Sequence, residues 1–477
     1  MQERATIHRL LDAPQRAHYV WRNRSNHLFV MNSKEQSNRR DFIKTSSAAA
    51  AAGALALPSV TFGKPDSRKL KLGWIGCGGR GSGAINQALN ADSNIQLWSI
   101  GEAFQDKADA GLERIKKIHP GQVDVDKGRV FVGLDAYKKV IDSGVDVVIL
   151  TTPPGFRPMH IKAAVDAGKH VFAEKPMATD APGVRSVMKS IAQAKKQGTS
   201  IVDGFVWRWT YAQRDTYKRI LGGDIGDIQA IFSCYNNNAR KRYPGFGRHN
   251  TKSDVEFMIR RWYYFTWLGG DHIVEQAVHS IDKMMWAKND EVPAYAIANG
   301  GRQVRVEEKF GNIYDHFGVE FAWADGTQGY HFSRQMDDCE NGVWDRIFGT
   351  KAKYTGESGR KLHVFSEKGE LKWRWDPGAN KERQNNGYQT EHDEMYAAIR
   401  DGKPLNTGDR MITTTLTAIM ARMAAYTGKK VTKEMALNSQ EQLVPDADKL
   451  TWNLAFPPKP PRKAGTDAAI APHKWKA

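Results

Sequence analysis

Residues 144–176 read GVDVVILTTPPGFRPMHIKAAVDAGKHVFAEKP, and this stretch decides the fold of the chain. The run Val145–Leu150 predicts a buried strand that ends at a Thr-Thr-Pro-Pro loop, and a short helix and a second apolar strand follow. Open α/β sheets bind their ligands outside the carboxyl ends of such strands. Lys175 lies between Glu174 and Pro176, directly after the second strand, and is therefore a candidate for proton transfer.

A glycine motif upstream indicates the ligand. Residues 70–75, LKLGWI, predict a strand that runs into GCGGRG at residues 76–81. This loop matches G-x-G-x-x-G, in which the glycines permit a tight turn, close approach of backbone to a pyrophosphate and close helix packing. A helix over 82–91 and a strand over 95–100 follow, which is the βαβ context of dinucleotide binding. We expect cofactor contacts from Gly76, Gly78, Gly79, Arg80 and Gly81.

Glu102 indicates which dinucleotide is bound. It follows Gly81 by 21 positions, where a carboxylate would accept hydrogen bonds from the ribose hydroxyls of NAD and repel the 2′-phosphate of NADP. We therefore predict NAD. NADP stays an alternative, because Arg80 lies in the loop.

Composition excludes several classes of protein. The chain has 477 residues, 40% hydrophobic and 26% charged, which suffices for two ordinary cores and argues against a membrane-embedded protein. The formal net charge is +17, but residues 1–69 hold 12 Lys and Arg against 5 Asp and Glu, and the remainder is spread along the chain. We expect neither a nucleic-acid nor a membrane partner. Cys77, Cys234 and Cys339 are widely spaced and predict no disulfide framework and no metal site.

Residues 1–69 are predicted to be a leader and linker. SNRRDFIK at 37–44 is a twin-arginine pattern, and a weakly apolar run over 46–57 contains the candidate cleavage site Ala54-Leu55-Ala56. This run is too short to span a bilayer stably. We expect export of the folded protein to the periplasm or out of the cell, with maturation near residue 56. The residues before Met31 do not resemble a signal peptide, so Met31 is a second candidate start.

Periodicity divides the rest of the chain into two domains and an arm. Residues 70–195 alternate strand and helix and predict an α/β Rossmann domain with a doubly wound parallel sheet. Residues 196–455 contain longer alternating strands, such as 228–235 and 317–323, and predict an α+β domain with an open, mostly antiparallel sheet. Two late helices, 389–400 and 409–426, should cover that sheet or return to the first domain. Residues 456–477 are rich in proline and predict an extended arm or an oligomer strap.

The motifs together resemble the glucose-fructose oxidoreductase / inositol dehydrogenase / MocA (Gfo/Idh/MocA) family, in its branch with twin-arginine signals. The likeness rests on the glycine motif, the Thr-Pro-Pro strand end and the A-G-K-H-V-x-x-E-K-P segment, and it covers roughly residues 70–440. It implies a Rossmann domain, a second domain with an open sheet, and NAD(P)-linked chemistry on sugars or cyclitols. A homo-oligomer, dimer or tetramer, is also expected. The implied further cofactor contacts are Thr152, Pro153, His160, Glu174 and Lys175.

The resemblance also implies catalytic residues. Lys175 matches the lysine of the family's Glu-Lys-Pro motif, and GGDHIVEQAVHSID at 269–282 is similar to the helix that carries the family's catalytic histidine, here His279. Glu275 stands where the family has aspartate, which leaves the division of labour between Glu275 and His279 open. Glu275, His279 and Asp282 are spaced to share one face of a helix, where they would hold a sugar hydroxyl and accept its proton. The alternative is that they form ordinary helix pairs around a core histidine.

Residues 235–267 combine aromatic side chains with amide and guanidinium donors, and this composition suits a substrate lid, because rings stack on sugar C–H faces and the donors satisfy hydroxyls. The alternative is that individual rings belong to the core or to a subunit contact. His272, just before the helix face, is either a substrate contact or a local cap. The candidate substrate contacts are Asn237, Arg240, Arg261, Tyr264, His272 and Asp282.

Three functions are compatible with these residues. The first is an oxidoreductase that transfers hydride between a sugar or cyclitol and a tightly bound nicotinamide. The second is an NAD-dependent glycoside hydrolase or lyase that oxidises C3 transiently and cleaves by elimination, with no net redox change. The third, a sugar-binding protein without activity, is disfavoured by the joint presence of Lys175, Glu275 and His279. The usual histidine motif of such glycosidases differs from residues 275–282, which favours the first function.

Overall fold

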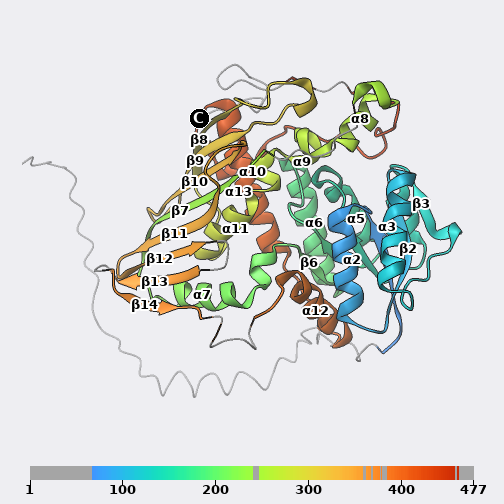
Figure 1. Ribbon diagram of the computed structural model, residues 1–477, viewed down its shortest axis with the longest axis horizontal. Helices are drawn as coiled ribbons and strands as arrows, with labels where there is room; N and C mark the ends of the chain where they lie inside the picture. Colours follow the sequence, from blue (N-terminus) through green and yellow to red (C-terminus); the bar gives the residue numbers. More distant parts are fainter. Residues whose placement is uncertain are drawn as a thin grey trace, which may run out of the picture. The chain divides into compact units, whose positions relative to one another are not determined.

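The computed structural model describes residues 67–239, 247–357, 361–366, 369–376, 378, 384–456 and 459–460 (Figure 1). The twin-arginine pattern, Arg240 and most of the predicted C-terminal arm lie outside these residues. None of the helices in the described part of the chain has the length and apolarity of a membrane span.

The first domain is a parallel sheet of six strands in the order β3-β2-β1-β4-β5-β6. Its strands are β1 (Leu70–Ile75), β2 (Ile95–Glu102), β3 (Val130–Val132), β4 (Val147–Leu150), β5 (His170–Ala173) and β6 (Ile201–Asp203). The connecting helices are α2 (Gly79–Ala91), α3 (Gln105–Ile118), α4 (Ala136–Asp142), α5 (Arg157–Asp166) and α6 (Ala181–Gln197). All four residues of β4 are buried, as expected for a parallel sheet covered on both faces. The predicted doubly wound sheet is confirmed.

The first sheet continues past the boundary predicted at residue 195. β6 pairs with β5, and α12 (Gly387–Arg400) returns from late in the chain to pack on α2. β6 has only three residues, too few for a periodic pattern to be read from the sequence.

The second domain is built on a nine-stranded sheet in the order β14-β13-β12-β11-β7-β10-β9-β8-β15. Its only parallel pair among the described strands is β7 with β10, so the expected open, mostly antiparallel sheet is confirmed. The strands are β7 (Ile228–Asn237), β8 (Tyr295–Gly301), β9 (His316–Ala322), β10 (Gln328–Gln335), β11 (Gly342–Gly349), β12 (Ala352–Glu357), β13 (Lys361–Ser366), β14 (Leu371–Arg374) and β15 (Val431–Thr432).

Helices cover one face of this sheet (Figure 1). α11 (Val278–Ala287) packs on β7 and β11, and the long α13 (Gly408–Thr427) packs on β8 and also on α6 of the first domain. The remaining helices of this domain are α7 (Tyr211–Leu221), α8 (Asp254–Arg260), α9 (Thr266–Gly269), α10 (His272–Glu275) and α14 (Lys433–Asn438). The two predicted late helices therefore serve both expected purposes: α12 returns to the first domain, and α13 touches both.

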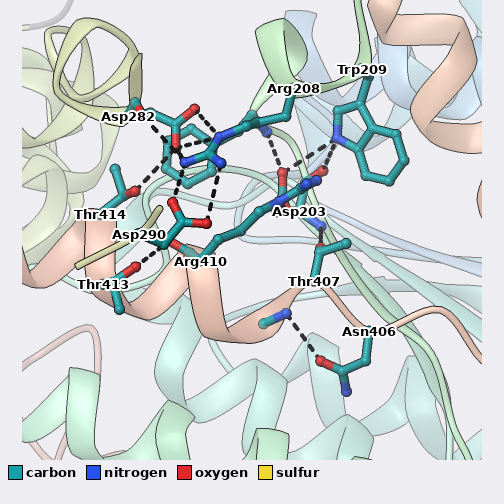
Figure 2. Close-up of polar contacts among 12 residues, drawn as sticks. Asp203, Arg208, Trp209, Asp282, Asp290, Asn406, Thr407, Arg410, Thr413 and Thr414 are labelled. Carbon is teal, nitrogen blue, oxygen red and sulfur yellow. Dashed lines mark hydrogen bonds and ion pairs between the residues drawn. The ribbon is translucent and has the colours of Figure 1, made fainter. Parts of the chain in front are cut away.

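Buried ion pairs hold the junction between the domains (Figure 2). Asp203, the last residue of β6, accepts a hydrogen bond from Arg410 Nε of α13 at 2.6 Å. Arg208, which follows β6, donates from Nε to both carboxylate oxygens of Asp282 on α11, at 2.9 and 3.1 Å. Thr414 Oγ1 of α13 donates to the same carboxylate at 3.0 Å. Because each buried charge has an opposite partner, the junction is defined by specific contacts as well as by apolar packing.

Candidate functional site

A cavity of about 580 Å³ opens at the carboxyl ends of β1, β2 and β4. This is the point where the strand order of the first sheet reverses, and open sheets bind ligands there. Nine of the predicted cofactor contacts line it: Gly76, Gly78, Gly79, Arg80, Gly81, Glu102, Thr152, Pro153 and His160. Glu174 and Lys175 are not among the lining residues.

The glycine loop fits a dinucleotide. Gly76 has φ of +97°, which side chains rarely adopt, and a Cβ on Gly81 would lie 2.1 Å from the carbonyl oxygen of Gly76. A Cβ on Gly78 or Gly79 would instead meet nothing within 4 Å, so it would occupy space into which a pyrophosphate fits. The loop thus needs glycine for backbone shape and packing at two positions, and for ligand access at the other two.

Glu102 ends β2 beside this loop. Its carboxylate accepts hydrogen bonds from the backbone N–H groups of Cys77 and Ala103, both at 2.7 Å. Burial raises the pKa of Glu102, and these backbone hydrogen bonds oppose the rise. Each carboxylate oxygen can accept more than one hydrogen bond, so the group is fixed in place and still able to bind ribose hydroxyls.

Arg80 is occupied by protein carboxylates. Its Nε donates to Glu174, and its second terminal nitrogen lies 3.0 Å from Glu391 Oε1 on α12. Tyr388 stacks on the guanidinium, 4.4 Å from ring centroid to Cζ. Arg80 therefore ties the glycine loop to the residue before Lys175, and the charge that made NADP an alternative is largely neutralised within the protein.

Lys175 meets Glu275 across the two domains. Its Nζ donates to the backbone carbonyl of Glu275 at 2.5 Å and lies 3.2 Å from Glu275 Oε1. Burial lowers the pKa of Lys175, while the Glu275 and Glu174 carboxylates oppose that shift. The ammonium is thus positioned by a residue one hundred positions away and loses its proton more easily than an exposed lysine.

The segment 275–282 is not one continuous helix, so the expected helix carrying Glu275, His279 and Asp282 together is wrong, and only His279 and Asp282 share α11. α10 ends at Glu275 and α11 begins at Val278, because the chain breaks its helical path at Gln276 and Ala277. Glu275 reaches Lys175, whereas His279 lies among aromatic rings, 5.3 Å from Trp207 and 6.3 Å from Phe205 between centroids.

Asp282 lies at the domain junction described above, 1% exposed and bound to Arg208 and Thr414. These contacts engage its carboxylate within the protein. A part in substrate binding would require Asp282 to give them up.

His160 and Arg157 support the loop after β4. His160 Nδ1 lies 3.2 Å from Thr152 Oγ1, and burial, together with the charge of Arg157, lowers the pKa of His160 to about 3. The ring is therefore neutral at neutral pH. Arg157 donates to the backbone carbonyl oxygens of Thr152, at 2.7 Å, and of Pro176. Arg157 connects the cavity loop with the turn after Lys175, a role that no sequence motif indicated.

The predicted substrate contacts are dispersed. His272 is buried, with Nδ1 3.2 Å from the Tyr314 carbonyl and Nε2 3.2 Å from Ser333 Oγ. Tyr264 is 1% exposed within a hydrophobic cluster, and Arg261 donates to the Lys309 carbonyl. Asn237 ends β7, paired with Gln335 of β10. His272, Arg261 and Tyr264 thus have contacts inside the second domain, and Arg240 lies outside the described residues.

Several residues that line the cavity were not predicted from the sequence to be cofactor contacts. Lys107, Arg114, Arg260 and Trp262 line the cavity, and the last two come from the second domain. Arg114 donates to Ser82 Oγ at 2.9 Å, next to the glycine loop. The only sequence signal for this wall is the abundance of arginine and aromatic residues over 235–267, a composition that also suits a substrate lid.

Comparison with known proteins agrees with this architecture. Residues 70–202 match the model of the GFO_IDH_MocA family, described as an oxidoreductase family with an NAD-binding Rossmann fold, and residues 36–56 match the twin-arginine translocation signal. The predicted NAD-binding domain and export signal are confirmed.

Among curated proteins, the chain is similar to an inositol 2-dehydrogenase of Rhodococcus erythropolis, 26% identical over 36% of this chain and 46% of the relative. The chain spans about half the length of the curated relatives it matches. Among solved structures, a levoglucosan dehydrogenase in complex with NADH and levoglucosan has a TM-score of 0.60 at 17% identity, over 76% of this chain and 99% of that one. An aldose-aldose oxidoreductase from Caulobacter crescentus has a TM-score of 0.60 at 18% identity, over 76% of this chain and all of that one. At these identities the structures establish the fold.

Proposed function

Since residues 70–202 form the NAD-binding domain of the Gfo/Idh/MocA oxidoreductase family, we propose that this protein transfers hydride between NAD and a hydroxyl-bearing carbon of a sugar or cyclitol. The observation that carries the proposal is the position of Lys175. It follows β5, the neighbour of β4, whose own carboxyl end contributes Thr151, Thr152 and Pro153 to the cavity. Its Nζ is partly buried against Glu275 from the second domain. This position supports Lys175 as the proton-transfer group, because the strand that it follows neighbours one that ends at the cavity.

The chain's own residues manage the hydroxyl proton in this proposal. Bound NAD supplies the hydride acceptor. Lys175 with a lowered pKa can take the proton from the hydroxyl as the carbon is oxidised, and Glu275 holds the Nζ in place. His279 is a second proton-handling group. Beside it lies the half-buried Trp207, the proposed stacking partner of a sugar C–H surface, with Lys283 Nζ 4.1 Å from the centre of its ring.

The substrate class is inferred from similar proteins. The similar curated proteins are named inositol 2-dehydrogenase, and the similar structures include levoglucosan and aldose oxidoreductases. All of these names refer to ring polyols or sugars. We propose NAD over NADP because Glu102 would repel a 2′-phosphate and Arg80 is already paired with two carboxylates.

The test uses purified protein stripped of nucleotide. NADH and NADPH are titrated first, and the protein with NAD is then incubated with inositols, aldoses and anhydrosugars while reduced nicotinamide is followed by absorbance and products by mass spectrometry. We expect tighter binding of NADH than of NADPH and an oxidised polyol product. A cleaved glycoside without an oxidised sugar would favour the elimination reaction, and absence of nucleotide binding would refute the proposal.

A further inference from the structure

The nucleotide cavity has a wall that the second domain supplies. Ile259 and Arg260, at the end of α8, and Trp262, in the 3-10 helix that follows, line the cavity together with Glu102 and Phe104 of the first domain. Glu102 is the proposed ribose partner, so this wall faces the adenosine half of the dinucleotide.

Arg260 bridges the two domains at this wall. Its guanidinium stacks on the ring of Phe104 at 3.8 Å and lies 3.5 Å from Asp106 at the start of α3. Its Nε also donates to Glu256 Oε1 on its own helix at 2.8 Å. The Arg260 side chain is only 15% exposed. Stacking and ion pairing together therefore connect α8 with the loop that follows Glu102.

An apolar cluster keeps this wall in place. Val255, Phe257, Met258, Tyr263 and Tyr264 are buried there, and Phe104 and Leu134 of the first domain pack against them. The late segment 443–456 joins the same cluster, with Trp452 5.5 Å from Phe104 between ring centroids. The wall is thus supported from three parts of the chain, and Phe104 contacts both Arg260 and Trp452.

We propose that Arg260 is a latch that retains the dinucleotide between turnovers. The proposal rests on the proposed function and deepens it. The adenosine half lies between Glu102 and the Arg260–Trp262 wall, and the nucleotide leaves only after Arg260 separates from Phe104 and Asp106. An exported enzyme would gain from this arrangement, because it would leave the cytoplasm with its cofactor already bound.

The test measures NADH release from the purified protein. NADH fluorescence is followed after addition of excess NAD to wild type, Arg260→Met, Asp106→Asn and the control Arg248→Met. Arg248 also pairs with two carboxylates and lies 5.1 Å from the ring of Phe257, but it does not line the cavity. We expect release to be at least tenfold faster in Arg260→Met, a few-fold faster in Asp106→Asn and unchanged in Arg248→Met.

Release at the wild-type rate from Arg260→Met would overturn the latch, whatever the rate in Asp106→Asn. A parallel titration with NADPH tests whether Arg260 instead binds the 2′-phosphate of NADP. If Arg260→Met weakens NADPH binding while leaving NADH release unchanged, Arg260 is a 2′-phosphate ligand and the latch is refuted. Wild-type protein that binds neither nucleotide would instead overturn the proposed function, so the two failures are distinguishable.

Discussion

Lys175 is the residue on which the proposed chemistry depends most. Its side chain is 10% exposed, bound to Glu275 and absent from the lining of the nucleotide cavity. We therefore expect Lys175→Met to lower turnover by about a hundredfold or more while nucleotide affinity stays nearly unchanged, as for a group that acts on the transferred proton. Steady-state kinetics and NADH titration measure the two effects. Lys162→Met is the matched control, because Lys162 is 61% exposed and pairs only with Asp166 among the contacts described.

The pH dependence of the same reaction tests the state of this lysine. Because burial lowers the pKa of Lys175, its proton is lost at a lower pH than from an exposed lysine. If the neutral amine is the base, the rate of substrate oxidation rises with pH through that lowered pKa and then levels off. Lys175→Met should lack this rise. A pH profile that is the same in the two proteins would exclude Lys175 as the base.

Variants of Glu275 and His279 distinguish a residue that positions Lys175 from a residue that transfers the proton itself. Glu275→Gln keeps the backbone carbonyl that receives Lys175 Nζ but removes the carboxylate charge, so we expect a clear loss of turnover that is smaller than in Lys175→Met. His279→Ala should cost about a hundredfold if the imidazole handles a proton. Both variants are compared by kcat at saturating substrate. Near-normal kcat in His279→Ala would make this residue a packing partner of Trp207.

At the scale of elements, the end of β6 connects the domains through Asp203 (Figure 2). Asp203 is fully buried and bound to Arg410, so Asp203→Asn leaves the Arg410 guanidinium, 20% exposed, without its counter-charge. We expect a loss of about 3 kcal/mol of unfolding free energy, measured by urea denaturation. Asp409→Asn is the control, since this neighbouring carboxylate is 73% exposed and its pair with Lys195 should contribute less than about 1 kcal/mol.

The Asp203–Arg410 pair also determines how the stability of the folded protein depends on pH. Burial alone would raise the pKa of Asp203, but Arg410 and the backbone N–H of Phe205 bring it below the usual value. A lowered carboxyl pKa stabilises the folded state at pH above the unfolded value, about 3.9. That stabilisation is lost as pH falls through the folded-state pKa. The difference between wild type and Asp203→Asn should therefore be constant near neutral pH and shrink in acid; a difference that grows in acid would contradict the assignment.

At the scale of the whole molecule, the nine-stranded sheet has one face without helices among the described residues. Phe232 contacts Tyr330 and Phe348 on this face, and Phe332 and Phe348 are 44% and 37% exposed. We propose that a second copy of the chain covers it, because clustered exposed aromatic rings mark interfaces. Phe332→Asp with Phe348→Asp should yield monomers in sedimentation analysis. Val306→Asp, 70% exposed outside the sheet, should leave the oligomer intact; a monomeric wild type would refute the proposal.

Export is the second prediction for the whole molecule. Residues 36–56 match a twin-arginine signal, a pathway that carries folded proteins, and we propose the periplasm as the destination. Replacing both Arg39 and Arg40 with lysine should leave the precursor uncut in the cytoplasm, as judged by fractionation and N-terminal sequencing. The wild-type mature chain should begin near residue 57. Normal export of the double variant would exclude this route.

The sequence by itself determined the nucleotide-binding domain, because its glycine motif and its proposed ribose partner lie close together in the chain, over residues 76–102. The glycines at 76 and 81 are dictated by backbone shape and packing within a few residues, and Glu102 stands at the end of the next strand. The second sheet was likewise evident from its alternating strands. Local periodicity and backbone constraints depend on residues close together in the chain, so both can be predicted from the sequence.

Tertiary structure alone decided which side chains meet. Lys175 finds Glu275 one hundred positions away, and Arg80 finds Glu391 on a helix that returns from the other end of the chain. The break at Gln276 and Ala277 places Glu275 and His279 on two different helices, although their spacing suits one helix. The Arg260 wall exists only because α8 packs against the first domain. The same physical reason underlies these four observations. The partner of a charged or aromatic side chain depends on how distant elements pack. Helical spacing predicts neighbouring side chains only where the helix is continuous.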